Sequence, residues 1–147
     1  MATVSTPMTT EEFLALPDDG VERMLIRGEL RVLGGDSVTK RNFWHSQCLS
    51  VISFLLVNWL RKQPFPRGKV LGGEVGCRLL GDQETTVGID VCYVSAEVAA
   101  RAGRDTTIID GSPVLAVEIL SPYDKHEDII DKINEYLAAD VKLVWIV

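Results

Sequence analysis

The sequence predicts a single α/β domain whose β-sheet is covered by helices on both faces. Its length of 147 residues suits one domain with one sizeable core. Apolar residues make up 46% of the chain and charged residues 24%, which is typical of a folded globular protein. Helical and strand-like segments follow one another, and the strand-like segments of the second half are apolar at consecutive positions. Such runs are typical of strands that are buried on both faces.

The chain begins with segments that predict a short helix and a β-hairpin. The helix lies in TTEEFLALP (residues 9–17), where Thr9 can cap it and Glu12 completes a capping box. The hairpin lies in VERMLIRGELRVLGG (residues 21–35), with its turn at Arg27-Gly28.

A long helix is expected from about Lys40 to Lys62, and the prolines and glycine of QPFPRG end it. Its apolar residues recur at helical spacing, which indicates one apolar face. The residues of this stripe are Trp44, Cys48, Val51, Ile52, Leu55 and Trp59. His45 lies within the same face, where a histidine is more often a hydrogen-bonded core residue than a metal ligand.

The second half of the chain predicts four strands and two helices. The strands are expected in VLGGEVGCRLL (residues 70–80), TTVGIDVCYVS (85–95), SPVLAVEIL (112–120) and VKLVWIV (141–147), and the helices in SAEVAARAG (95–103) and YDKHEDIIDKINEYLAAD (123–140). No repeat, low-complexity segment or linker interrupts this order, so we expect residues 1–147 to form one domain. Because the sequence stops inside an apolar strand, we expect it to be truncated at its C-terminus.

Charge and cysteine content narrow the function classes. A net charge of −6 argues against a protein that coats nucleic acid by bulk electrostatics, but it is compatible with an acidic site that binds cations. The three cysteines, Cys48, Cys77 and Cys92, lie in apolar segments without a CxxC pair, which indicates buried free thiols in a reducing compartment. We find no signal peptide, and the longest apolar stretch, Val51–Leu60, is too short to span a bilayer. We therefore expect a cytoplasmic protein without membrane association.

Carboxylates inside apolar strands are the strongest chemical signal. Glu118 lies among aliphatic residues, Asp90 lies in another apolar strand, and Glu74 lies in the strand before that one. A lone buried charge costs several kcal/mol unless it is paired or binds a metal. If the Asp90 and Glu118 strands are neighbours, their oxygens converge and can hold a hard cation such as Mg²⁺ or Mn²⁺. The alternative is that both acids face solvent or pair with arginines.

The last predicted helix can add a cation to these acids. Lys132 lies on the border of its apolar stripe, from which its side chain can reach back toward Glu118. Lys125, two turns earlier, is a rival on the same border. The stripe consists of Ile129, Ile130, Ile133, Tyr136 and Leu137, and the opposite face, with Asp128, Asp131 and Glu135, is expected to be solvated. Glu22, at the start of the hairpin, is a further candidate.

These segments together resemble the Uma-two family of restriction endonucleases, members of the PD-(D/E)XK nuclease superfamily. The resemblance runs over nearly the whole chain: TTEEFLALPDDGVERMLIRGEL, the helix with His45, IDV, VEILSP and DIIDKINEYLAADVKLVWIV. It implies a restriction-endonuclease-like core, in which a mixed β-sheet is flanked by helices and preceded by an N-terminal helix and hairpin. It also implies that the family's chain continues beyond the last strand.

The resemblance implies roles for individual residues. Asp90 takes the place of the motif aspartate and Glu118 that of the second acid, and both would hold Mg²⁺ together with the backbone carbonyl of Ile119. The superfamily's lysine normally lies two residues after the second acid, where this chain has Leu120. In this family the lysine lies on the following helix, which points to Lys132. Glu22 matches the glutamate that the family carries near its N-terminal helix, and it would orient the lysine or assist a second ion. Apart from the resemblance, His45, Glu74 and Lys125 are candidates for accessory roles.

One departure from the family pattern concerns the residue before the motif aspartate. The family usually has proline there, whereas this chain has Ile89. Proline supplies no ligand, so we expect this difference to affect the geometry of the strand rather than the chemistry.

The function implied by the resemblance is metal-dependent hydrolysis of phosphodiester bonds in DNA, with a homodimer as one expected assembly. The alternative is an inactive nuclease-fold module that binds nucleic acid or protein. RNA or other phosphate esters remain open as substrates, as does the recognition sequence. Basic residues that could form a DNA-facing rim are Lys40, Arg41, Arg61, Lys62, Arg67, Lys69, Arg101 and Arg104.

Overall fold

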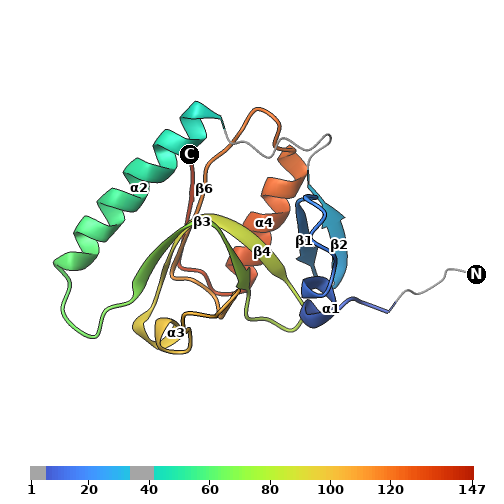
Figure 1. Ribbon diagram of the computed structural model, residues 1–147, viewed down its shortest axis with the longest axis horizontal. Helices are drawn as coiled ribbons and strands as arrows, with labels where there is room; N and C mark the ends of the chain where they lie inside the picture. Colours follow the sequence, from blue (N-terminus) through green and yellow to red (C-terminus); the bar gives the residue numbers. More distant parts are fainter. Residues whose placement is uncertain (1–5, 34–41) are drawn as a thin grey trace, which may run out of the picture.

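The computed structural model describes residues 6–33 and 42–147, and this part of the chain forms four α-helices and one seven-stranded sheet (Figure 1). In chain order the elements are α1 (Thr10–Leu14), β1 (Arg23–Ile26), β2 (Glu29–Val32), α2 (Phe43–Arg61), β3 (Lys69–Arg78), β4 (Thr86–Val94), α3 (Ala96–Ala100), β5 (Ile109–Asp110), β6 (Leu115–Glu118), α4 (His126–Ala138) and β7 (Leu143–Ile146). The predicted α/β class is confirmed. The capping box at Thr9 and Glu12 and the hairpin turn at Arg27-Gly28 are also confirmed.

The sheet is mixed, and β4 is at its centre. One edge of β4 pairs along its length with antiparallel β3. The other edge is shared, because β1 pairs at Thr86 and β6 pairs at Val91–Tyr93, both antiparallel. The parallel pairs are β3 with β5 and β6 with β7. Residues 87–90 therefore have no strand partner at the shared edge among the described residues, and β1 and β6 leave a gap there.

Helices cover both faces of the sheet. Cys92 and Ala116 belong to an apolar cluster that includes Tyr136 of α4. Their neighbours Val91 and Val117 belong to a second cluster, with Leu56 of α2. Because successive strand residues point to opposite faces, α4 and α2 pack on opposite faces of the sheet. This arrangement confirms the two-sided burial that the apolar strands predict.

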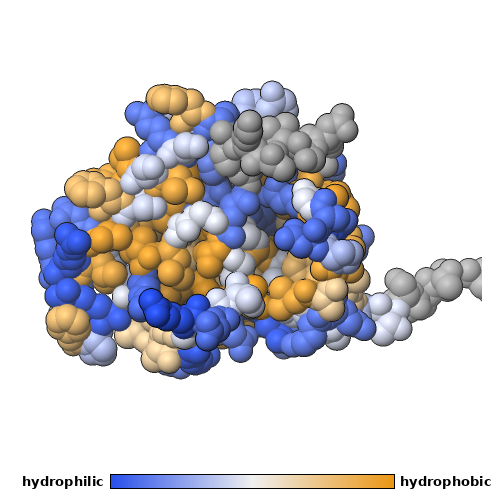
Figure 2. All heavy atoms as spheres, viewed as in Figure 1, coloured by the Kyte–Doolittle hydropathy of each residue, from blue (hydrophilic) through white to orange (hydrophobic). Residues whose placement is uncertain are grey.

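The face of α2 that packs on the sheet agrees only in part with the predicted stripe, of which Cys48 and Ile52 pack against the second cluster. Trp44, Val51, Leu55 and Trp59 are exposed, whereas Leu56 and His45 are buried. The cause lies in the composition of the helix, because Phe43–Leu60 contains no Asp, Glu, Lys or Arg to mark a solvent face. Hydrophobic residues accordingly gather on the molecular surface over α2 in Figure 2. The predicted start at Lys40 lies outside the described residues.

The length of α2 also corrects the expectation based on Val51–Leu60. Among the described helices, α2 is long and apolar enough, by length and composition alone, to cross a membrane. A single helix of this kind is weak evidence for insertion. In this fold α2 packs against β3 and β4.

Two strand predictions differ from the structure. The apolar run Val114–Leu120 contributes only Leu115–Glu118 to β6, because pairing with β4 ends at Val117 and pairing with β7 ends at Glu118. The short β5 was not predicted, since two residues are too few for a periodic pattern.

The expected solvated face of α4 is wrong for Glu135, and Asp131, with 38% of its side chain exposed, is ion-paired as well as solvated. Glu135 is buried and accepts hydrogen bonds from Arg27 Nε at 2.7 Å and Thr85 Oγ1 at 3.0 Å. Asp131 forms an ion pair with Arg31 of β2. The β1–β2 hairpin thus supplies two arginines to α4, and sequence spacing within a helix cannot reveal partners from elsewhere in the chain.

The cysteines provide the first testable prediction. All three are free, and burial raises the pKa of Cys77 and of Cys92 to about 12. Because the thiolate is the reactive form, we expect a thiol reagent such as DTNB to modify only half-buried Cys48 in the native protein. All three thiols should react in denaturant. Rapid native modification of Cys77 or Cys92 would contradict their packing.

Candidate active site

A cleft of about 1130 Å³ lies at the gap between β1 and β6. It brings together residues from the hairpin, the start of α2, β3, β4, β6 and α4. Every residue singled out from the sequence lines this cleft: Glu22, His45, Glu74, Asp90, Glu118, Ile119, Lys125 and Lys132. These residues, which are up to 110 positions apart in the sequence, thus line one cleft.

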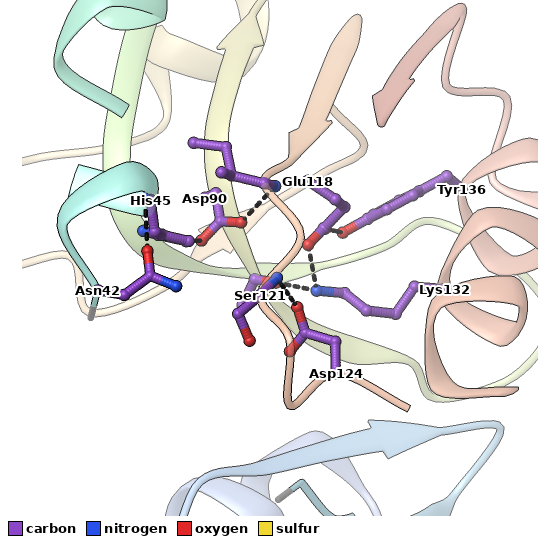
Figure 3. A network of polar contacts seen from close by, with 10 residues as sticks. Asn42, His45, Asp90, Glu118, Ser121, Asp124, Lys132 and Tyr136 are labelled. Carbon is purple, nitrogen blue, oxygen red and sulfur yellow. Dashed lines mark hydrogen bonds and ion pairs between the residues drawn. The ribbon is translucent and has the colours of Figure 1, made fainter. Parts of the chain in front are cut away.

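Asp90 is held at the unpaired edge of β4 by two donors (Figure 3). Its Oδ1 accepts a hydrogen bond from His45 Nε2 at 3.0 Å, and its Oδ2 accepts one from the Ile119 backbone N–H at 2.7 Å. The second bond replaces a strand-to-strand bond at the point where β6 leaves β4. Asp90 is 7% exposed, and these bonds compensate for much of the cost of its burial.

His45 reaches Asp90 from the first turn of α2. The side chain of Asn42 caps this helix by accepting a hydrogen bond from the His45 backbone N–H at 2.8 Å. Because a carboxylate oxygen can only accept a hydrogen bond, His45 Nε2 is the nitrogen that carries the hydrogen in this bond. The Nδ1 atom is buried and has no partner in the described part of the chain. The expected core histidine is thus confirmed as buried and hydrogen-bonded, and its partner is a candidate metal ligand.

Glu118, at the end of β6, contacts α4 on the other side of the sheet. Its Oε2 accepts a hydrogen bond from Lys132 Nζ at 2.8 Å, and its Oε1 accepts one from the Tyr136 hydroxyl. Burial raises the pKa of the Glu118 carboxyl, because lost hydration outweighs the Lys132 charge and both hydrogen bonds. The nearby charge of Asp90 adds a smaller upward effect on that pKa.

Lys132 contacts both Glu118 and the part of β4 that has no strand partner at the shared edge. Besides Glu118, its Nζ donates to the Gly88 carbonyl at 2.8 Å. Gly88 lies in the stretch of β4 without a strand partner at the shared edge, so the ammonium satisfies a backbone group that the gap leaves open. Lys125 is the N-cap of α4 and lines the same cleft. Of the two rival lysines, the structure places Lys132 against Glu118.

Asp90 and Glu118 lie next to each other at the end of the β4–β6 ladder. Val91 pairs with Val117, and each acid is one residue beyond this pair on its strand. The two carboxylates turn to different helices, Asp90 to α2 and Glu118 to α4, while both line the cleft. Opposing strand positions have Cβ atoms roughly 5 Å apart, which is compatible with ligands of one ion.

The other predicted acids lie around this pair. β3 has a bulge between Gly72 and Val75, so Gly73 and Glu74 are the two residues that face Asp90. Both have positive φ angles, 93° and 58°, and the bulge turns Glu74 into the cleft lining. Glu22 precedes β1 on the cleft wall, and its backbone carbonyl accepts a hydrogen bond from Leu33 N–H at 2.9 Å.

The donor set fits a hard divalent ion. Among the described residues, no group of three His, Cys, Asp or Glu side chains is arranged to hold a metal. Magnesium commonly uses only one or two protein carboxylates, with waters and substrate phosphate completing its shell. Asp90, Glu118 and the Ile119 carbonyl are oxygen donors of the kind that such a shell would use.

Acidic side chains outnumber basic ones in the cleft. The acids are Glu22, Glu74, Asp90, Glu118, Asp124 and Asp128, against Arg23, Lys125 and Lys132. Of the basic residues expected to form a rim, those in the described ranges do not line the cleft, and Lys40 and Arg41 lie outside these ranges. A phosphate that enters this cleft therefore meets a negative field unless cations compensate it.

Two groups of the site were not singled out from the sequence. Tyr136 was interpreted as part of an apolar stripe and of the stretch that resembles the family, but no role in the site was assigned to it. It lies one turn after Lys132 and could have been found by that spacing. The Gly88 carbonyl carries no signal in the sequence, because it depends on which strands pair with β4.

Comparisons with known proteins agree on the kind of fold. The model of the Uma2 family, described as "Putative restriction endonuclease", matches residues 10–147. No curated protein matches the sequence. A crystal structure described as "a putative nuclease belonging to DUF820" from Anabaena variabilis is similar with a TM-score of 0.71 and 19% identity, over 96% of this chain and 74% of that one. This structural similarity supports a restriction-endonuclease-like fold.

Proposed function

The chain belongs to the Uma2 family of restriction endonucleases, and from this premise we propose that it hydrolyses phosphodiester bonds in DNA with Mg²⁺. The observation that carries the proposal is the ion pair of Lys132 with Glu118 in the cleft that Asp90 also lines. Asp90 of β4, Glu118 of β6 and Lys132 of α4 meet beside the unpaired part of β4. Packing does not require these charged groups, since apolar residues would serve that purpose better.

In the proposed mechanism Asp90, Glu118 and the Ile119 carbonyl would hold Mg²⁺. When bound, Mg²⁺ would lower the pKa of the attacking water and neutralise the charge that develops on the phosphate. The Lys132 ammonium would position the attacking water, from a place within hydrogen-bond reach of Glu118, and the proton of that water would pass to solvent. His45 and the Ile119 N–H hold Asp90 in place during this step.

The acidic cleft supports metal dependence of DNA binding as well as of cleavage. Without a cation, the phosphates of DNA and the carboxylates of the cleft repel each other. Divalent ions relieve this repulsion at the point where the reaction occurs.

An inactive nuclease-fold module is the second candidate, and one observation favours it. Each oxygen of Asp90 and Glu118 already accepts a hydrogen bond from the protein. An acid that only closes a polar network needs no metal.

The test is cleavage by the 147-residue chain of supercoiled plasmid, single-stranded DNA, RNA and a small phosphodiester, with Mg²⁺, Mn²⁺ or EDTA. We expect plasmid nicking or linearisation with Mg²⁺ or Mn²⁺, and loss of cleavage with EDTA. Calorimetric titration with Mg²⁺ reports binding independently of activity. Neither binding nor cleavage would favour the inactive module, and cleavage of RNA alone would contradict the DNA assignment.

A further inference from the structure

Tyr136 is a buried residue of α4 whose hydroxyl group is aimed at the site. It has no exposed surface, and its hydroxyl donates to Oε1 of Glu118. Its ring lies in the apolar cluster between α4 and the sheet. Phenylalanine would fill this apolar space equally well, so packing alone does not require the hydroxyl group.

The two donors to Glu118 approach from different sides. Both side chains come from α4 and contact different oxygens of Glu118 (Figure 3). Lys132 lines the cleft, whereas Tyr136 does not line it and is fully buried. The Lys132-bonded oxygen, Oε2, therefore lies on the cleft side, and Oε1 is turned toward the core. The Glu118 carboxylate is thus bound on the core side by the neutral Tyr136 hydroxyl and on the cleft side by the Lys132 cation.

We propose that Tyr136 is a positioning residue of the nuclease reaction, which acts by fixing the Glu118 carboxylate so that Oε2 faces the cleft. The inference rests on the proposed function, because it assumes that Glu118 binds the metal. It adds a role for a residue that touches neither the cleft nor the substrate.

Glu118 needs a second hydrogen-bond donor because Lys132 also faces the cleft. When Lys132 turns to water or phosphate, its bond to Glu118 weakens, and the buried carboxylate depends on the Tyr136 hydroxyl to keep its orientation. Partners that hold a metal ligand from behind typically contribute 10- to 100-fold to metal affinity or activity. Tyr136 is the described residue in that place behind Glu118.

The test is Tyr136→Phe, which deletes the hydroxyl group and keeps the buried ring. We expect the Mg²⁺ concentration for half-maximal cleavage to rise about tenfold or more, with much of the rate restored at saturating Mg²⁺. Calorimetry should show a similar loss of Mg²⁺ affinity. Tyr93→Phe is the matched control, because Tyr93 packs edge-on against Trp59 on the α2 side and does not line the cleft. Its Mg²⁺ dependence should equal that of the wild type.

The outcomes separate the inference from the proposed function. A wild type that neither binds Mg²⁺ nor cleaves overturns both. An active wild type with unchanged Mg²⁺ dependence in Tyr136→Phe overturns the positioning role alone. If the variant fails to fold, proton NMR of the wild type decides: the Tyr136 hydroxyl resonance should shift on addition of Mg²⁺ and not of Na⁺. An unchanged resonance overturns the role.

Discussion

Replacing Asp90 by asparagine is expected to abolish Mg²⁺-dependent cleavage while leaving the fold intact. Asparagine keeps the shape of the side chain but removes the negative charge that attracts the ion. A metal ion contributes several kcal/mol to the stabilisation of the transition state, and each 1.4 kcal/mol is roughly a tenfold change in rate. We therefore expect cleavage to fall by about 1000-fold or more.

The fold tolerates this change because both partners of Asp90 can adapt. The amide oxygen can still accept from the Ile119 N–H, and the amide group can donate to His45 once the histidine proton moves from Nε2 to Nδ1. The cost is a buried Nδ1–H without an acceptor, since Nδ1 has no partner in the described structure. We expect the free energy of unfolding to fall by only about 1–2 kcal/mol.

Plasmid cleavage and thermal unfolding measured on the same preparation test this prediction. Asp110→Asn is the matched control, because Asp110 is exposed on β5 and outside the cleft lining. It should cleave at the wild-type rate. Cleavage that persists in Asp90→Asn at the wild-type rate would refute the metal-ligand role.

The location of the site could be predicted from the sequence because buried charge is rare. Asp90 and Glu118 are conspicuous among aliphatic neighbours, and each lies in a strand recognisable from its own residues. The structure places both in one cleft, with Lys132 against Glu118. The sequence can show this because burying a charged side chain is costly. A carboxylate inside an apolar strand therefore indicates a functional role.

The partners of these residues could not be predicted, because they come from segments distant in sequence. Glu135 of α4 binds Arg27 of the hairpin, and the packed face of α2 is decided by the sheet rather than by its own nearly uncharged sequence. The gap between β1 and β6 depends on which strands share an edge of β4. Local patterns identify candidate ligands, and only tertiary pairing decides what holds them.

Lys132→Met is expected to produce the second large effect, a loss of cleavage of about 100- to 1000-fold. Methionine keeps the apolar stem that lies along the sheet and removes the ammonium from Glu118 and Gly88. Lys142→Met is the control, since Lys142 pairs with exposed Asp140 away from the cleft. Lys125→Met decides between the rival lysines. A loss in Lys125→Met with full activity in Lys132→Met would reverse the assignment.

Stability has to be separated from catalysis in this variant. Removing one partner of a buried ion pair can cost about 3–5 kcal/mol, because the other charge is left in an apolar site. Burial already raises the pKa of Glu118, so without Lys132 the carboxyl can take up a proton and limit this cost. The double variant Lys132→Met with Glu118→Gln removes both charges and should recover most of the stability lost in Lys132→Met. Cleavage should remain absent in it, because a restored fold without the acid and the lysine lacks the groups that carry the reaction.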